Sequence, residues 1–237
     1  SIFRVYGDEG WPKIAVLTGG TMNNISRNVG VRKKAEPMLG HIVSKYHQNE
    51  PFSIAERNVL IVDEQRAGFI FGNGGIAHFL QAYYDGGNAS AIKAFGMVIR
   101  AVLSAIFRTA YSKHIFRSLK MNIRIESTKL RNDFFTLVGI ATVADLGFRF
   151  RPFYKVETHK DHFQVIGMTC PPIKIASSMP NIWLARPTNR DDIEDVMGRS
   201  AKILPELPMA YTIDGDLYET DSELSIRIGP RVQFIID

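Results

Sequence analysis

Two aspartates near the end of the chain could carry out acid–base and metal chemistry. Asp214 and Asp216 flank Gly215, between the apolar residues Ile213 and Leu217. Asp-Gly is a strong signal for a tight hairpin turn, which would explain the tripeptide on structural grounds alone. Its functional interpretation is two carboxylates on a rigid turn, one accepting the proton of an attacking hydroxyl and one holding Mg²⁺ against phosphate. On its own, the tripeptide favours a structural hairpin turn over a catalytic pair of carboxylates.

A second stretch, near the start of the chain, is typical of a phosphate-binding turn. The apolar run 14–17 predicts a short buried strand. Gly19 and Gly20 then open a tight loop, because glycine takes backbone angles that other residues avoid. Candidate caps for a following helix are Thr21, Asn23 and Asn24. Free backbone N–H groups at such a turn suit a phosphate, although any α/β protein can contain the same unit.

The elements that must position these two stretches are predicted from apolar periodicity. Helices are expected from Pro37 onward, over 76–84 and over the long amphipathic region 89–120, with a shorter one over 190–196. A hairpin is expected from strands at 58–63 and 67–71. Further strands are expected at 121–126, 133–143, 162–167, 181–184, 210–213, 224–228 and 232–236. Short strands at regular spacing predict a β-sandwich-like domain.

Composition excludes several classes of protein. The 237 residues are enough for one large or two small domains, and 45% hydrophobic with 22% charged residues excludes a disordered chain. The single cysteine, Cys170, excludes an internal disulfide and indicates a reducing compartment, with a buried structural thiol favoured over a nucleophile. We find neither a secretory leader nor a stretch long enough to span a bilayer, so a cytoplasmic protein is expected.

The net charge of +5 is concentrated in one region. Between residues 93 and 131 the only acid is Glu126, and the basic residues there are Lys93, Arg100, Arg108, Lys113, Arg117, Lys120, Arg124, Lys129 and Arg131. Such a field attracts anionic membranes, nucleic acid or acidic partners. A solvated basic face with no partner explains it equally well.

Taken together, the two stretches resemble the diacylglycerol kinase and sphingosine kinase catalytic family, which includes bacterial lipid kinases. Gly20-Thr21-x-Asn23-Asn24-x-x-Arg27 is similar to the family's G-T-x-N-D-x-x-R loop, and Asp214-Gly215-Asp216 is similar to its late D-G-E turn. Phe71-Gly72-Asn73 resembles the family's F-x-N segment that enters a helix. The resemblance spans nearly the whole chain, with the motifs in the same order.

This resemblance implies an ATP-dependent kinase that uses Mg²⁺ to phosphorylate the hydroxyl of a lipid alcohol, such as diacylglycerol or a sphingoid or ceramide lipid. It implies an α/β plus β fold: a partial α/β nucleotide-binding domain over 1–50, then a β-sandwich-like domain over 51–237 whose final strand can return to the first. The basic stretch would hold the enzyme peripherally on an anionic membrane, and no nucleic-acid partner is implied. The lipid acceptor and the oligomeric state are left open.

The resemblance also assigns residues to roles. Asp214 would be the general base, Asp216 would lie near the nucleotide and the metal, and Asn73 would bind the substrate. The nucleotide-binding residues would be Gly19, Gly20, Thr21, Asn23, Asn24, Arg27 and Asp216.

Several positions depart from the family pattern. Its G-G-D-G-T loop is expected upstream of residue 19 and does not occur there, so a chain that truly begins at Ser1 is expected to be inactive. Asn24 stands where the family loop has an aspartate, and Asp216 stands where it has a glutamate. The family's D-D-G-x-L-D metal turn falls near 159–164, where Lys160 replaces the metal aspartate and Asp161 could substitute only in a shifted register.

Two other functions fit parts of the sequence. A non-catalytic lipid- or membrane-binding relative would explain Asn24, Lys160 and the missing loop. An Asp-x-Asp glycosyltransferase would explain Asp214 and Asp216 alone. Phosphoryl transfer to a lipid alcohol, liposome binding without turnover, and tight nucleotide-sugar binding distinguish the three.

Overall fold

The computed structural model describes residues 2–19, 23–85, 115–147, 150–188 and 190–237, which form two β-sheets and several helices. The first sheet has eight strands, in the order β3 (Arg66–Gly68), β2 (Ile54–Val62), β14 (Leu224–Ile235), β11 (Ser200–Pro205), β5 (Leu119–Ile125) and β6 (Thr128–Lys129), with β1 (Ile14–Ala15) on β14 and β7 (Phe134–Phe135) on β5. The second has six, in the order β10 (Ile193–Gly198), β9 (Phe163–Met168), β8 (Leu137–Ala141), β4 (Ile70–Gly74), β12 (Met209–Ile213) and β13 (Asp216–Thr220).

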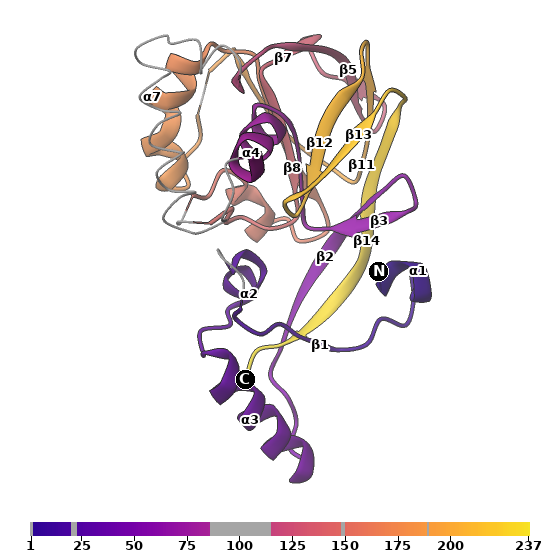
Figure 1. Cartoon of the computed structure of the whole chain (residues 1–237), viewed down its shortest axis with the longest axis vertical. Coiled ribbons are helices and arrows are strands. Elements are labelled where there is room, and N and C mark those ends of the chain that lie inside the picture. The colour runs from indigo at the N-terminus through magenta and orange to yellow at the C-terminus, as the bar shows by residue number, and fades with distance from the viewer. Residues whose placement is uncertain (1, 20–22, 86–114, 148–149, 189) are drawn as a thin grey trace.

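The helices are placed around these sheets (Figure 1). They are α1 (Ile2–Tyr6), α2 (Asn24–Val29), α3 (Ala35–His47), α4 (Gly75–Asp85), the 3₁₀ turn η1 (Tyr154–Glu157) and α7 (Pro172–Trp183). Of the helices in the described ranges, none combines the length and the apolar composition needed to cross a bilayer.

The two sheets pack face to face as a β-sandwich. Alternate residues of a strand point to opposite faces, so each sheet turns one set of side chains inward. Ile123 and Ile203 of the first sheet and Ile140 and Tyr211 of the second are almost fully buried in the shared core. On its other face, the second sheet packs against α7, which buries Ile175 among others.

A smaller α/β part lies below the sandwich in Figure 1 and contains α1, β1, α2 and α3. Its strand β1 pairs in parallel with β14, whereas the other strand pairs are antiparallel. Met38 of α3 is fully buried there, in a core with Ile61 of β2 and with Val232 and Phe234 of β14. The long strands β2 and β14 therefore run through both parts of the molecule.

A bulge in β14 lets this strand serve both cores. Ile228 pairs with Leu60 and Arg231 pairs with Asn58, so two residues of β14 lie opposite one residue of β2. An extra residue reverses which side chains of a strand face a given side. Leu224 therefore faces the sandwich core, whereas Val232, an even number of residues later, faces the α/β core.

The α/β plus β fold expected from the sequence is confirmed, but three local predictions were wrong. Residues 181–183 end helix α7, with Leu184 as its C-cap, rather than forming a strand, because the buried side chains Ile175, Ser178 and Ile182 recur at helical spacing. Residues 193–196 form β10 rather than a helix, because they pair along the buried strand β9. Residues 119 and 120 belong to β5, and residues 89–114 of the predicted long helix lie outside the described residues.

We expect Ile203→Ala to lower the free energy of unfolding by about 2–5 kcal/mol, because it leaves a cavity in the sandwich core. The adjacent Leu204 points to the other face of β11 and is 49% exposed. Leu204→Ala should therefore change stability by no more than about 0.5 kcal/mol. Urea denaturation of both variants measures the difference, and similar losses in the two would contradict the assigned strand faces.

Candidate functional site

The predicted Asp-Gly turn connects β12 to β13. Ile213 pairs with Asp216 across it, leaving Asp214 and Gly215 as a two-residue loop with φ values of 52° and 103°. Positive φ at both positions is the requirement of a type I′ hairpin turn. The Tyr84 hydroxyl of α4 donates a 3.0 Å hydrogen bond to the Gly215 carbonyl, which fixes the turn against the helix.

The Asp214 carboxylate is bound by backbone amides. The N–H of Ile70 donates to Oδ1 at 2.9 Å, and the N–H of Phe69 lies 3.0 Å from both Oδ1 and Oδ2. Gly68 allows this approach, since a Cβ at that position would lie 2.7 Å from Oδ2 and 2.3 Å from the Ile213 side chain. The side chain of Asp214 is therefore held in one orientation.

These surroundings change the acidity of Asp214. The residue as a whole is exposed, but its carboxyl oxygens face the backbone of residues 68–70, and the surroundings of the carboxyl group decide its pKa. Loss of hydration raises the pKa of Asp214 to about 6, the N–H donors Phe69 and Ile70 oppose the rise, and the charge of Asp216 adds to it. A carboxyl with this pKa can accept a proton near neutral pH.

Asp216 is exposed at the start of β13, close enough for its charge to act on Asp214. No group of three or more potential metal ligands occurs among the described residues. Mg²⁺ is commonly held by one or two carboxylates, with water and substrate phosphates as the other ligands. A single carboxylate at this turn fits such a role.

Helix α2 carries the motif residues near the chain start. Asn23 adopts a left-handed conformation at its N-cap, and Gly19 is exposed with no atom within 4 Å of the place of a Cβ. Arg27 is exposed and lies 3.8 Å from Asp145. Asn24 donates to the Leu146 carbonyl at 2.9 Å, while its buried Oδ1 has no hydrogen-bond partner. Gly20 and Thr21 lie outside the described residues.

The loop 142–147, which follows β8, contacts both groups of motif residues. At one end, the Thr142 N–H donates to the Phe69 carbonyl at 3.0 Å, and the Phe69 N–H is the donor to Asp214. At the other end, the Leu146 carbonyl of the loop accepts a hydrogen bond from the side-chain amide of Asn24. Neither Asn24 nor Arg27 makes a direct hydrogen bond or ion pair with either aspartate of the turn. The loop 142–147 thus contacts the α2 motif directly and the Asp214–Asp216 turn through Phe69, although the two do not contact each other through these side chains.

Asn28, on α2, makes the most bonds to this loop. Its Nδ2 donates to the carbonyls of Asp145 at 2.7 Å and of Asn24 at 2.8 Å, and its Oδ1 accepts from the Asp145 N–H at 3.0 Å. Asp145 in turn accepts the Gly147 N–H at 2.7 Å, which closes the loop on itself. These contacts dock α2 onto the sandwich.

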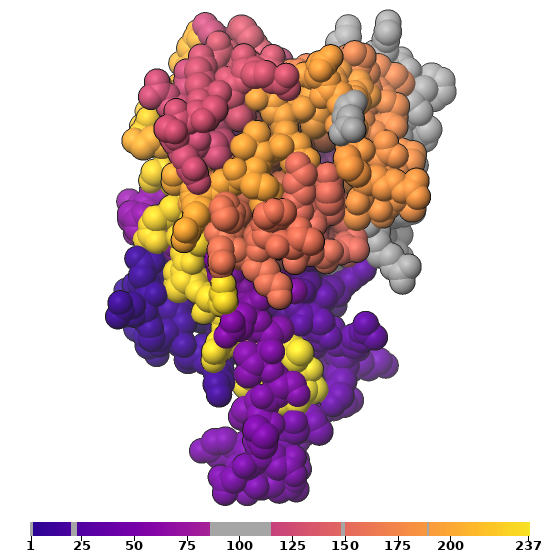
Figure 2. All heavy atoms as spheres, turned by 180° about the vertical axis from the view of Figure 1, so that it is seen from behind, coloured from indigo at the N-terminus to yellow at the C-terminus, as the bar shows by residue number. Residues whose placement is uncertain are grey.

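A cleft of about 430 Å³ lies between α2, β2, the loop 142–147, η1 and β14. Its charged side chains are Glu56, Arg57, Glu157, Lys160 and Arg231. In Figure 2 the segment between β8 and β9, coloured salmon, borders the yellow of β14 and the purple of the first third of the chain. The cleft volume is in the usual range for small-molecule sites, about 300–1,000 Å³.

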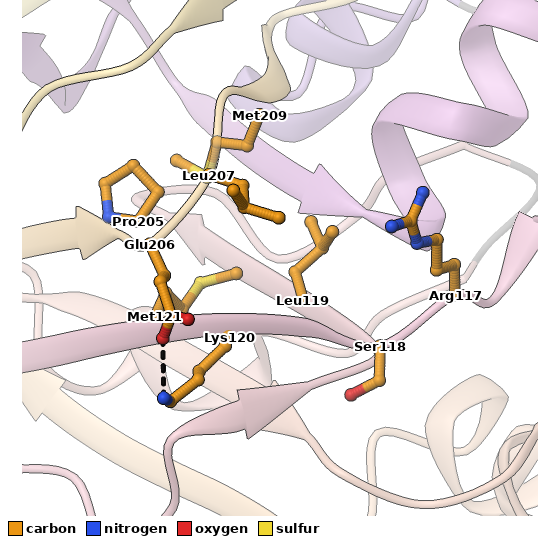
Figure 3. A pocket seen from close by; sticks show the side chains of 9 residues that line it. All are labelled: Arg117, Ser118, Leu119, Lys120, Met121, Pro205, Glu206, Leu207 and Met209. Carbon is orange, nitrogen blue, oxygen red and sulfur yellow. Dashed lines mark ion pairs between the residues drawn. The ribbon is translucent and has the colours of Figure 1, made fainter.

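Asn73 lies away from this cleft. It is fully buried in β4, where its amide donates to the sulfur atoms of Met121 and Met209, and its Oδ1 has no partner. The two methionines also line a second cavity of about 60 Å³, shown in Figure 3 with the 2.6 Å ion pair of Lys120 and Glu206 at its edge. That space is too small for a drug-sized ligand. Substrate binding by Asn73 stays a prediction.

The predicted metal-binding turn at 159–164 has few free side chains that could bind a metal. The carboxylate of Asp161 is paired with Arg231, and His159 is hydrogen-bonded to Thr158 at 2.9 Å. Lys160 lines the cleft. Lys160, which the resemblance sets at the position of a metal carboxylate, thus presents a cation to the cleft.

Sequence reasoning missed four residues that shape the site: Gly68, Asn28, Asp145 and Arg231. Two signals could have suggested some of them. Asp145-Leu146-Gly147 after an apolar run has the composition of a turn. Gly229-Pro230 within an alternating strand indicates a bulge, and a bulge redirects the residue after it, Arg231.

Comparison with known proteins supports the fold. No family model and no curated protein sequence matches the chain. The crystal structure of a diacylglycerol kinase from Bacillus anthracis str. Sterne matches with a TM-score of 0.64 and 16% identity, over 97% of this chain and 68% of that one. Two structures provisionally named as diacylglycerol kinases of the same organism match with TM-scores of 0.65 and 0.64 at 15% and 16% identity, over 97% of this chain and 70% and 71% of theirs. The chain therefore has the fold of these kinases.

The raised pKa of Asp214 predicts a pH dependence of stability. Because the folded pKa of about 6 exceeds the ordinary value of 3.8, the stabilising contribution of this residue is fully present below pH 3.8 and is lost as the pH rises through 6. We expect the unfolding free energy of the wild type minus that of Asp214→Asn to fall between pH 4 and pH 7. Denaturation across this range measures it, and a rising difference would show a lowered pKa instead.

Asn28→Ala should weaken the attachment of α2 to the loop 142–147. The change removes three hydrogen bonds, and we expect a loss of about 1–3 kcal/mol in stability together with faster hydrogen exchange at the Asp145 amide. Asn181→Ala, an exposed asparagine on α7, is the matched control and should leave that amide protected. Unchanged exchange at Asp145 in Asn28→Ala would rule out this docking contact.

Proposed function

We propose that the protein is an ATP-dependent lipid kinase that phosphorylates the hydroxyl of a lipid alcohol such as diacylglycerol or a sphingoid or ceramide lipid. The observation that carries the proposal is Asp214: its carboxylate is fixed by backbone amides, has a pKa of about 6, and is linked to the wall of a cleft through Phe69 and Thr142. The shared fold of the bacterial diacylglycerol kinases supports the same reaction class.

In this mechanism Asp214 accepts the proton of the lipid hydroxyl as the hydroxyl attacks phosphorus. Phosphoryl transfer leaves little covalent chemistry to the protein, so positioning and charge stabilisation are its main tasks. When bound, ATP supplies the phosphoryl group and Mg²⁺ neutralises its charge. The amide hydrogen bonds to Asp214 keep its carboxyl oriented, and Asp216 would hold the metal.

The nucleotide side of the site is formed by the start of α2. Gly19, Gly20, Thr21, Asn23, Asn24 and Arg27 are assigned to nucleotide binding. The buried Oδ1 of Asn24 supports this assignment, because an acceptor without a donor is costly unless a ligand or water satisfies it. Arg27 is half exposed and only loosely paired with Asp145, so it can turn toward a phosphate.

We also propose that the protein works peripherally on anionic membranes in the cytoplasm. Arg117, Arg124 and Arg131 of the basic stretch are exposed, and no described carboxylate pairs with them. Basic residues near an anionic bilayer contribute about 1 kcal/mol each to binding. This attraction to the membrane would bring the enzyme close to a lipid acceptor.

One observation favours a second candidate, a non-catalytic lipid-binding relative. Lys160 faces the cleft where the family places a metal carboxylate, and Asp161 is engaged by Arg231. Liposome binding that persists without phosphoryl transfer would support this candidate.

Asp214→Asn should lower kcat by about 10²–10⁴-fold while leaving lipid binding within a few fold, since a general base acts mainly in the transition state. Labelled-ATP transfer to a panel of lipid alcohols measures kcat, and vesicle co-sedimentation measures binding. Asp221→Asn removes the same charge from an exposed turn beyond β13 and serves as control. An equal fall in lipid binding, or full activity in Asp214→Asn, would exclude this residue as the base.

A further inference from the structure

The cleft contains two cations that have no carboxylate partner among the described residues. Lys160 is exposed at its edge, and no described residue pairs with its ammonium group. Arg57 donates only to backbone carbonyls, at 2.7 Å to Glu56 and 2.9 Å to Asn28. Both side chains therefore keep their full positive charge toward the cleft.

The carboxylates of the same cleft are already engaged. Glu56 lies 3.6 Å from Arg231 and accepts a 3.0 Å hydrogen bond from Gln233, and Glu157 is paired with Arg151. Arg231 is itself shared between Glu56 and Asp161. Glu157 and Arg151 cancel, whereas Arg231 balances only one of its two carboxylates, so Arg57 and Lys160 bring the net charge of this group to +1.

The lining also includes apolar residues, among them Ile54, Val143 and Val156. A ligand of this cleft should therefore carry a phosphate next to a less polar part. Arg57 is suited to the phosphate because its planar guanidinium is held by two carbonyls and needs little ordering on binding. Lys160 adds a compact positive charge on a flexible side chain, which can adjust to the position of the phosphate.

We propose that Arg57 and Lys160 bind the phosphate groups of a nucleotide directly in this cleft, so that binding does not need a bridging Mg²⁺ ion. The identity of the ligand rests on the proposed kinase function, whereas the two cations are properties of the structure. Charge then has two roles: Asp216 would hold the Mg²⁺ that serves phosphoryl transfer, and the cleft cations hold the nucleotide.

Isothermal titration calorimetry tests this with ATP in EDTA and with ATP in Mg²⁺. Wild-type affinity should agree within about threefold between the two conditions. Lys160→Ala should weaken binding at least about tenfold in both, as expected for a lost charge-assisted hydrogen bond. Lys160→Arg should stay near wild type. The matched control Lys202→Ala removes an exposed lysine outside the cleft and should have no effect.

Two results would overturn the inference: equal ATP affinity in wild type and Lys160→Ala, or loss of wild-type binding in EDTA. Adenosine, which has no phosphate, should bind weakly and be indifferent to Lys160→Ala. Competition with phosphatidylglycerol vesicles identifies the source of the phosphate. Vesicles that displace ATP and lose affinity in Lys160→Ala would keep the direct phosphate contact and assign it to a lipid headgroup.

The outcome is distinguishable from a failure of the kinase proposal. Transfer of phosphate to a lipid alcohol by Lys160→Ala, at an unchanged KM for ATP, would reject the role of Lys160 and leave the kinase intact. Lys160-dependent ATP binding with no transfer to any lipid alcohol would keep the cleft assignment and reject the kinase.

Discussion

The pairing of β2 with β14 is the interaction on which the rest of this structure depends. The two strands run through both the sandwich and the smaller α/β part, and the bulge at residues 229–230 reverses the faces of β14 between them. Without that reversal, Val232 and Phe234 would leave the α/β core, and Arg231 would leave the wall of the cleft. One irregularity in a strand thus couples the packing of two cores to the composition of the site between them.

The site is assembled from short segments that contribute backbone groups as much as side chains. Asp214 owes its orientation and acidity to the amides of Phe69 and Ile70 and to the absence of a side chain at Gly68. Helix α2 is bound to the loop 142–147 through the side-chain amides of Asn24 and Asn28, while its Val29 is buried in the α/β core. Such contacts are directional, so they define geometry at a small cost in buried surface.

Much of the fold was predictable from sequence because strand periodicity is local. The runs that became β2, β9 and β12 alternate or are continuously apolar, and such patterns indicate a strand without reference to its partners. The Asp214 turn was predictable because Asp-Gly suits positive φ at both loop positions. Where neighbours decided the outcome, prediction failed: residues 193–196 became a strand by pairing with β9.

The surroundings of the candidate site were the least predictable part. Nothing in the local sequence around Gly68 indicates that a carboxylate 146 positions later will lie against it. Likewise, the pairing of Asn28 with Asp145 joins residues 117 positions apart. These contacts depend on tertiary arrangement, and a motif match identifies Asp214 or Asn24 without identifying what orients them.

The β2–β14 pair also has a consequence for how the molecule folds. Arg231 and Asn58 are bonded across 173 positions of sequence, and the whole ladder closes a loop of similar size. Contacts this distant in sequence form late and slowly, because the entropy of closing the loop is lost before the contacts form. The sandwich can gain most of its hairpins first, whereas the cleft exists only after this closure. A partly folded chain would therefore expose the unpaired edge of β2, which is the surface most open to aggregation or to chaperone binding.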